Sequence, residues 1–254
     1  MGSLEPFELA QQNRVFETAS PEEIVRWAWE KFGGRLAFGT AFGSTGMVLL
    51  DVIQQTVPQI PVFTIDTGYL FQETLDLKSQ LEARYGFEIE SLHPRLSVSE
   101  QDRKFGGALF RHDPDRCCWM RKVEPLQRKL ADLDGWMTSL RRDQSDTRKG
   151  IGILEAYRTH SGRSLVKVNP MANWTRKQVW DYILVHDVPY NPLLDQGYPS
   201  VGCWPCTQAV GNTDDERAGR WAGTAKTECG IHTFMGSVEP SDSPVQVETA
   251  AAAD

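Results

Sequence analysis

The amino-acid sequence predicts an α/β fold with a doubly wound, mainly parallel sheet. Two observations support this prediction. From residue 35 onward, short apolar segments alternate with segments of helical spacing, which is the order of strand–helix–strand units in a parallel sheet. Segments rich in glycine, hydroxyl groups or arginine follow directly after three of the predicted strands. Ligands of doubly wound sheets bind at those strand ends, so the local pattern and the expected site agree.

The first predicted element is a helix that follows Ser20. This serine is an expected N-cap, Pro21 suits the first helical position and Glu23 stands at the capping-box position. Gly33 and Gly34 are expected to end the helix. Residues 1–31 are therefore predicted to form an N-terminal helical segment.

Strands and helices are then expected to alternate along an α/β domain over residues 32–212. Predicted strands span residues 35–40, 60–67, 87–94, 135–142 and 164–171. Predicted helices span residues 44–55 and 69–86, and a further one begins after Thr175, a plausible N-cap. Residues 213–236 are expected to form a C-terminal catalytic segment, and the polar, proline-containing residues 237–254 to be disordered.

Composition and charge exclude several classes of protein. The 254 residues carry 27 Lys and Arg against 34 Asp and Glu, a net charge of −7, which argues against a nucleic-acid-binding protein. No apolar stretch approaches the roughly 18 residues of a membrane span. The N-terminus lacks the basic and apolar regions of a secretory signal, so a cytoplasmic location without membrane association is expected.

The glycine-rich stretch GTAFGSTG, residues 39–46, joins a predicted strand to a predicted helix. Glycine lets the backbone approach a ligand, and the start of a helix offers N–H groups to an anion. The hydroxyl groups of Thr40, Ser44 and Thr45 are further donors. The stretch matches neither the Walker A pattern nor GxGxxG. Anion binding and a simple unstrained turn therefore remain equal alternatives from this segment alone.

Four of the five cysteines form two groups. Cys203 and Cys206 make a C-x-x-C pair, and Cys117 and Cys118 are adjacent in a segment of helical composition. In a reducing compartment such groups are more often metal ligands or redox thiols than disulfides. A four-cysteine zinc site usually has two C-x-x-C pairs, and adjacent helical cysteines suit a larger iron–sulfur cluster better. Lys122, one helical turn after Cys118, is expected beside it as a stabilising cation.

The fifth cysteine, Cys229, lies in the segment KTECGIH. Lys226 and His232 are each three residues away, and nearby cations lower the pKa of a thiol. Arg217 and Arg220, spaced to share one helical face, are suited to gripping a phosphate or sulfate group. A lone cysteine is often only a packing residue. With the other four cysteines already grouped, this neighbourhood favours a nucleophile.

Five motifs together resemble the iron–sulfur branch of the phosphoadenylyl-sulfate reductase family, which contains the assimilatory adenylyl-sulfate reductases. They are CCWMRK, GCWPC, ECGIH, IDTGYLFQET and LRRDQSDTR, and the resemblance covers residues 32–234. It implies an adenine-nucleotide α-hydrolase-like fold with a mobile C-terminal segment. It also implies reduction of adenosine 5′-phosphosulfate to sulfite and AMP, through an S-sulfocysteine intermediate on Cys229 that a thioredoxin-type thiol releases.

The resemblance also assigns residues. Cys117, Cys118, Cys203 and Cys206 would hold one 4Fe–4S cluster, with Lys122 facing it. The residues implied in substrate binding are Thr40, Gly43, Ser44, Thr45, Asp66, Thr67, Gly68, Arg141, Arg142, Arg148, Arg217, Arg220 and His232.

Alternatives remain open at this stage. Reduction of 3′-phosphoadenylyl sulfate, or of both nucleotides, is the nearest one, and a non-enzymatic zinc-stabilised binding module is the second. A nucleotide-activating ATP pyrophosphatase is disfavoured because its S-G-G-x-D-S loop is missing. No thioredoxin-like segment follows residue 236, so the reductant is expected to be a separate protein. A homo-oligomer is expected.

Overall fold

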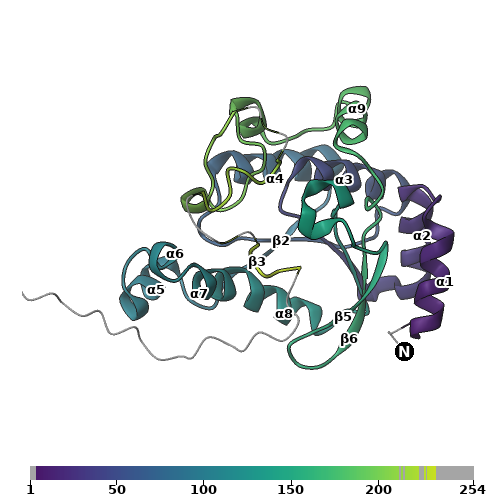
Figure 1. The fold of residues 1–254 in the computed structure, drawn as a ribbon, viewed down its shortest axis with the longest axis horizontal. Helices are drawn as coiled ribbons and strands as arrows, with labels where there is room; N and C mark the ends of the chain where they lie inside the picture. The colour runs from purple at the N-terminus through teal and green to yellow at the C-terminus, as the bar shows by residue number, and fades with distance from the viewer. Residues whose placement is uncertain (1–3, 212, 214, 223–225, 227, 233–254) are drawn as a thin grey trace, which may run out of the picture.

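The computed structural model describes residues 4–211, 213, 215–222, 226 and 228–232 (Figure 1). Within them a six-stranded sheet has the order β3-β2-β1-β4-β6-β5. The strands are β1 Leu36–Gly39, β2 Val62–Ile65, β3 Glu90–Leu92, β4 Gly135–Met137, β5 Leu154–Arg158 and β6 Ser164–Val168. All neighbouring strands pair in parallel except β5, which is antiparallel to β6. The predicted mainly parallel α/β fold is confirmed.

The chain builds the sheet outward in two directions from its middle. It runs from β1 to β2 and β3 on one side, then returns to place β4 and β6 on the other. The described helices are α1 Pro6–Phe16, α2 Pro21–Phe32, α3 Ser44–Thr56, α4 Gln72–Tyr85, α5 Val98–Phe105, α6 Leu109–His112, α7 Pro114–Cys118, α8 Glu124–Leu130 and α9 Arg176–His186. A π-helical turn, Trp119–Val123, joins α7 to α8. The reversal between β1 and β4 creates the switch point at which doubly wound sheets bind ligands.

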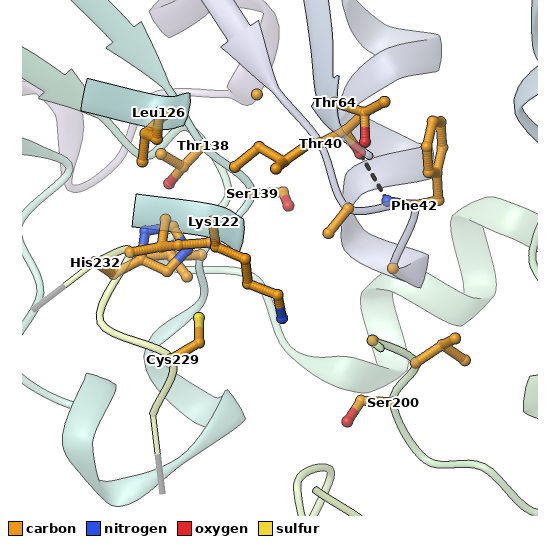
Figure 2. Close-up of a pocket in the computed structure, with 18 of the residues that line it drawn as sticks. Thr40, Phe42, Thr64, Lys122, Leu126, Thr138, Ser139, Ser200, Cys229 and His232 are labelled. Carbon is orange, nitrogen blue, oxygen red and sulfur yellow. Dashed lines mark hydrogen bonds between the residues drawn. The ribbon is translucent and has the colours of Figure 1, made fainter. Parts of the chain in front are cut away.

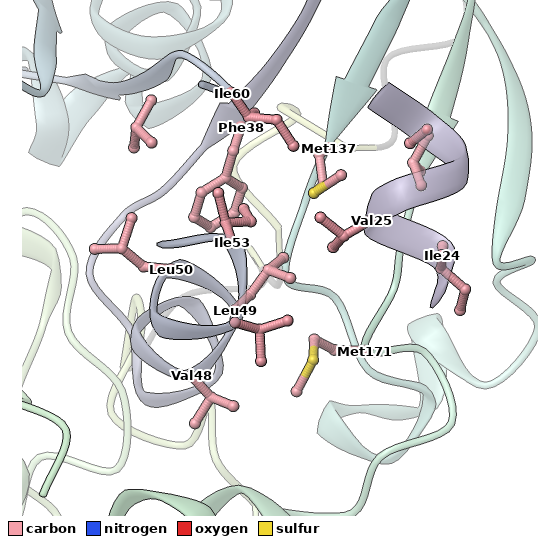
Figure 3. Close-up of a cluster of buried hydrophobic side chains, with 14 of the residues drawn as sticks. Ile24, Val25, Phe38, Val48, Leu49, Leu50, Ile53, Ile60, Met137 and Met171 are labelled. Carbon is pink, nitrogen blue, oxygen red and sulfur yellow. The ribbon is translucent and has the colours of Figure 1, made fainter. Parts of the chain in front are cut away.

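Two apolar cores lie on opposite faces of the sheet, because successive side chains of a strand point to opposite sides. Phe38 of β1 belongs to the larger core, with residues of α2 and α3 (Figure 3). Residues of α9 belong to the same core. Ala37, the preceding residue, packs instead with Leu126 and Leu130 of α8. Helices therefore cover both faces, and the cavity described below opens at an end of the sheet.

Local capping signals in the sequence are confirmed. The Ser20 hydroxyl accepts from the N–H of Glu23, and the Glu23 carboxylate accepts from the Ser20 N–H. Thr175 caps α9 in the same reciprocal way. Helix α4 ends at Gly86, whose φ of 70° lies in the left-handed region that glycine favours. These helix ends are set by interactions between residues close together in the sequence, so the local sequence suffices to predict where the helices begin and end.

Other elements differ from the prediction. Strand β5 and the short helices α5 and α6 were not predicted, and the observed strands are shorter than expected. Strand β5 pairs at the edge of the sheet through contacts with β6, which the local sequence does not reveal. The tail predicted over residues 237–254 lies outside the described residues. No helix among the described residues is long and apolar enough to cross a membrane.

The first residue of β4 gives a test of the packing. A Cβ atom on Gly135 would lie 2.7 Å from Cδ2 of Phe32 and 2.8 Å from Cδ1 of Leu36. We expect Gly135→Ala to lower the free energy of unfolding by about 1–3 kcal/mol, because well-packed cores resist added volume. Gly107→Ala is the control, since a Cβ there meets no atom within 4 Å. Equal urea midpoints for the two variants would contradict this packing.

Candidate functional site

A cavity of about 230 Å³ lies beyond the carboxyl ends of β1, β2 and β4 (Figure 2). We call it the strand-end cavity. Gly39, Ile65 and Thr138 bring the three strand ends to its wall. Figure 2 shows the thiol of Cys229 and the ammonium group of Lys122 extending into the same space. The cavity therefore occupies the switch point of the sheet and joins segments that are far apart in the sequence.

The glycine-rich loop forms one wall of the strand-end cavity. The Thr40 hydroxyl accepts from the N–H of Phe42 at 3.0 Å, and Phe42 is buried with a φ of 58°. A buried side chain in the left-handed region stores backbone strain, which is common at functional sites. Of the four residues of this loop expected to bind substrate, Thr40 and Gly43 line the cavity, whereas Ser44 and Thr45 do not.

The predicted Asp66–Gly68 segment contributes one residue to the strand-end cavity. Asp66 closes a turn by accepting from the N–H of Gly68 at 2.9 Å, and neither residue lines the cavity. Thr67 does line it, and its hydroxyl lies 3.3 Å from the sulfur of Cys203. The segment therefore links the cavity to one of the paired cysteines.

The predicted arginines divide into two groups. Arg148, Arg217 and Arg220 line the strand-end cavity. Arg141 is fully buried outside it, and its guanidinium donates to Thr45, Asp143 and Glu216 at 2.5–2.8 Å. Arg142 donates to Glu17, Asn173 and the carbonyl of Ile151. Arg141 and Arg142 thus lie away from the cavity that was expected to hold them, because neighbouring loops and the end of α1 already engage their donors.

Cys229 lines the strand-end cavity beside cations. Burial works to raise the pKa of its thiol. The charge of Lys122, a hydrogen bond from the Ile231 N–H and the charge of Arg220 outweigh burial. The pKa of Cys229 consequently lies below that of an ordinary thiol. More thiolate is present at neutral pH, and the thiolate is the nucleophilic form.

His232 stacks on Trp136, with ring centroids 5.5 Å apart and an angle of 11° between the planes. Burial, together with the charges of Lys167 and Arg148, holds the pKa of His232 well below its usual value. The imidazole is therefore neutral at physiological pH. Sequence reasoning selected His232 but missed Trp136 and Lys167, which reach this region from β4 and β6.

A second, narrow cavity is lined by all four paired cysteines, Cys117, Cys118, Cys203 and Cys206. We call it the cysteine cavity. Within the described part of the chain, no three His, Cys, Asp or Glu side chains are placed to hold a single metal ion. Four thiols that line one space form an all-sulfur donor set, and cysteine thiolates are the ligands that hold iron–sulfur clusters. The residues present therefore fit the group expected from the sequence.

Separate contacts anchor each of the two cysteine groups. The Asp113 carboxylate caps α7 by accepting from the N–H of Arg116, which fixes Cys117 and Cys118. The Trp204 N–H donates to the Tyr69 carbonyl at 2.8 Å, which ties the C-x-x-C loop to the segment after β2. Burial raises the pKa of Cys117 to about 12 and that of Cys118 to about 11. Metal binding at these thiols would therefore release protons.

Lys122 lies on the wall that the strand-end cavity and the cysteine cavity share, and so does Cys203. Lys122 comes from the π-helical turn, an irregularity that is frequent at functional sites. Burial alone would lower its pKa, but the neighbouring thiols of Cys203, Cys229 and Cys118, once deprotonated, raise it. Lys122 is thus close to Cys118, as the sequence predicts, and it is also close to Cys229.

The sequence profile of the phosphoadenosine phosphosulfate reductase domain matches residues 35–209. The adenosine 5′-phosphosulfate reductase 2 of Bacillus subtilis is 44% identical over 211 residues, covering 83% of this chain and 88% of its own length. The phosphoadenosine 5′-phosphosulfate reductase of Gloeobacter violaceus is 45% identical over 222 residues, covering 86% of this chain and 91% of its own length.

Solved structures agree with the fold. The phosphoadenylyl-sulfate reductase of Candida auris, solved as a phosphate complex, superposes with a TM-score of 0.72 and 33% identity. That match covers 82% of this chain and 98% of the other. An FMN adenylyltransferase of Candida glabrata has a TM-score of 0.55 at 15% identity over 82% of this chain and 67% of its own, a likeness of fold alone.

The lowered pKa of Cys229 predicts that its thiol is alkylated at a lower pH than an ordinary thiol. We expect iodoacetamide to label Cys229 at a lower pH than an ordinary thiol, because the thiolate reacts. Lys122→Met should shift the midpoint of labelling to higher pH, since it removes a cation that lowers the pKa of Cys229. Lys149→Gln, on an exposed lysine paired with Asp146, is the matched control. Peptide mass spectrometry would measure labelling of Cys229 separately, and an unshifted midpoint in Lys122→Met would refute the assignment.

Proposed function

This chain belongs to the phosphoadenosine phosphosulfate reductase family, and we propose that it reduces adenosine 5′-phosphosulfate to sulfite and AMP. The observation that carries the proposal is Cys229, a thiol with a lowered pKa in a cavity lined by Lys122 and three arginines. Membership of the family confirms the resemblance seen in the motifs. It also disfavours the alternative of a non-enzymatic zinc-stabilised module.

The proposed reaction starts with attack by the Cys229 thiolate on the sulfur of the substrate's sulfate group. A bond forms between the two sulfur atoms, the bond from sulfur to the phosphate oxygen breaks, and AMP leaves with that electron pair. An S-sulfocysteine remains on Cys229. No proton need be delivered to AMP at neutral pH, which is consistent with a neutral His232 in the cavity.

An external dithiol of the thioredoxin type completes the proposed reaction. One of its thiolates attacks the sulfur of Cys229, and sulfite leaves with the electron pair of the bond between the two sulfur atoms. The second thiol resolves the mixed disulfide and restores Cys229. The dithiol supplies both electrons. This reductant is a separate protein in our proposal, and the enzyme works in the cytoplasm in sulfate assimilation.

The cations of the strand-end cavity have a defined task in this reaction. Negative charge develops on the leaving phosphate and on the sulfonyl oxygens, and fixed cations stabilise it. Arg148, Arg217, Arg220 and Lys122 are the cavity residues suited to this. Thr40, Gly43 and Thr67 are the members of the predicted binding loops that line the same space. We propose these residues as substrate contacts.

Reduction of the 3′-phosphorylated nucleotide is the second candidate. It is favoured by one specific observation, since relatives with both names are equally similar to this chain. The two substrates differ by one phosphate on the ribose. A comparison of kcat/KM for the two nucleotides, with the same reductant, separates the candidates.

We further propose that Cys117, Cys118, Cys203 and Cys206 hold a 4Fe–4S cluster. Their convergence on one cavity and their all-thiol chemistry support this. Such a cluster, when bound, fixes its ligand segments and adds local charge. The chain's own Lys122 then faces both the cluster ligands and the strand-end cavity.

The proposed nucleophile is tested without reductant. We expect anaerobic protein mixed with ³⁵S-labelled adenosine 5′-phosphosulfate to carry about one sulfonate per chain, because the reaction stops at the covalent intermediate. Non-reducing gels and peptide mass spectrometry would locate the label on Cys229, and reduced thioredoxin should release it as sulfite. Cys229→Ser should take no label. Label on any other cysteine would exclude the proposed nucleophile.

The proposed cluster is tested by substituting serine for a proposed ligand cysteine and, as a control, for Cys229. Cys203→Ser should lose bound iron and acid-labile sulfide, because a cluster ligand is removed. Cys229→Ser is the matched control and should keep wild-type iron, at about four atoms per chain. Iron analysis and visible absorption after anaerobic purification give the readout. Zinc in place of iron in the wild-type protein would overturn this assignment.

A further inference from the structure

Glu228, the residue before Cys229, bridges two arginines of the strand-end cavity. One carboxylate oxygen lies 3.3 Å from Nη2 of Arg148, and the other lies 3.1 Å from Nη2 of Arg217. The Thr147 hydroxyl is 3.4 Å from the first oxygen. The side chains of Glu228, Arg148 and Arg217 are only 13%, 12% and 15% exposed. This is an ion-pair cluster with little access to water.

Two arginine side chains with so little exposure, lying side by side, are stabilised by a neighbouring anion. Burial lowers the pKa of Arg217, and the positive charge of Arg148 lowers it further, while Glu228 acts in the opposite direction. Breaking a buried ion pair by removing one partner leaves an uncompensated charge and is strongly destabilising. Glu228 therefore supplies negative charge to this arginine pair.

The same arginine pair suits an oxyanion. Guanidinium groups bind carboxylate and phosphate oxygens with similar geometry, because both present paired oxygens to the N–H groups. The proposed substrate carries two such groups, a phosphate and a sulfate. One of these and the Glu228 carboxylate cannot occupy the same N–H groups at the same time.

We propose that the Glu228 carboxylate holds the oxyanion subsite between Arg148 and Arg217 until the substrate displaces it. Glu228 is then a positioning residue that couples substrate binding to the Cys229 segment. The inference rests on the proposed function for the identity of the anion. Beyond that function, Glu228 is a residue of the chain itself that competes with the substrate for the anion subsite.

The displaced side chain has space to enter. Glu228 also lines a side cavity of about 350 Å³, whose wall shares Arg148 and His232 with the strand-end cavity. Lys167, on β6, lines that side cavity together with Glu155, and its ammonium group pairs with the Glu155 carboxylate at 2.9 Å. A carboxylate that leaves the arginine pair would therefore enter a polar space, in which Lys167 would be shared with Glu155, without any rearrangement of the apolar cores.

Displacement of Glu228 acts directly on the nucleophile because the two residues are neighbours in the chain. While the Glu228 carboxylate holds both arginines, this side chain ties the segment that carries Cys229 to the cavity wall. Once an oxyanion takes those arginines, the segment loses these two ion pairs. The Cys229 segment is then free to adjust to the substrate and, after the transfer, to meet the external thiol.

The test measures anion binding to the intact, cluster-loaded protein. Isothermal titration with inorganic sulfate, and separately with AMP, compares wild type with Glu228→Gln. Removing the competing charge should tighten binding of at least one anion by about fivefold or more, the lower end of usual coupling effects. Glu228→Asp keeps the charge and should stay close to wild type. Asp146→Asn, which removes an exposed carboxylate paired with Lys149, controls for net charge.

A measurement on the wild type does not depend on whether the variant folds. Hydrogen exchange of the peptide that contains Glu228 and Cys229 should become faster when sulfate is added, because the anion releases the carboxylate. A ligand that only covers the segment would slow exchange. Slower or unchanged exchange, or equal or weaker anion binding by a stably folded Glu228→Gln protein, would overturn the inference.

These outcomes are separable from failure of the proposed function. Sulfate and AMP binding need no turnover, no reductant and no sulfonated Cys229. If Glu228→Gln binds anions more tightly but Cys229 never takes up sulfonate, the role of Glu228 as a competitor is supported and the proposed substrate is contradicted. If sulfonate forms on Cys229 but anion affinity is the same in wild type and Glu228→Gln, the proposed substrate is supported and the role of Glu228 is contradicted.

Discussion

The charge of the buried Lys122 ammonium group acts on both parts of the site, the strand-end cavity and the cysteine cavity. It lies between the strand-end cavity and the cysteine cavity, and the deprotonated forms of Cys203, Cys229 and Cys118 raise its pKa against the effect of burial. The dependence is mutual, since Lys122 is the largest influence that lowers the pKa of Cys229. Moving this cation would therefore change the pKa of the Cys229 thiol and the surroundings of the cysteine cavity together.

The fold explains how these groups meet. Parallel strands present their carboxyl ends at one end of the sheet, and the reversal between β1 and β4 leaves an opening there. The π-helical turn after α7 places Lys122 at that opening, directly after Cys117 and Cys118. The C-x-x-C loop and the Cys229 segment then close the cavity from the C-terminal side. The sheet therefore determines where the cavity lies, and the irregular segments carry the lysine and cysteine side chains that line it.

Features governed by neighbouring residues could be predicted from the sequence, and features governed by long-range packing could not. The caps at Ser20 and Thr175 involve residues three apart, and both were predicted. Arg141 and Arg148 are alike in chemistry and belong to one motif. Arg141 is withdrawn from the cavity by Glu216, 75 residues away in the chain. Strand β5 likewise forms only because β6 is present to pair with it.

A built-in competitor also has consequences for catalysis. Interactions that are equally strong in the bound substrate and in the transition state do not raise kcat. Displacing Glu228 consumes part of the affinity that Arg148 and Arg217 offer to any oxyanion, so ground-state substrate and the product AMP are both held less tightly. In the proposed reaction the returning carboxylate would help AMP to leave, and it would reposition the segment that carries Cys229. Clearing the cavity in this way would prepare Cys229 for the thiol that completes the proposed reaction.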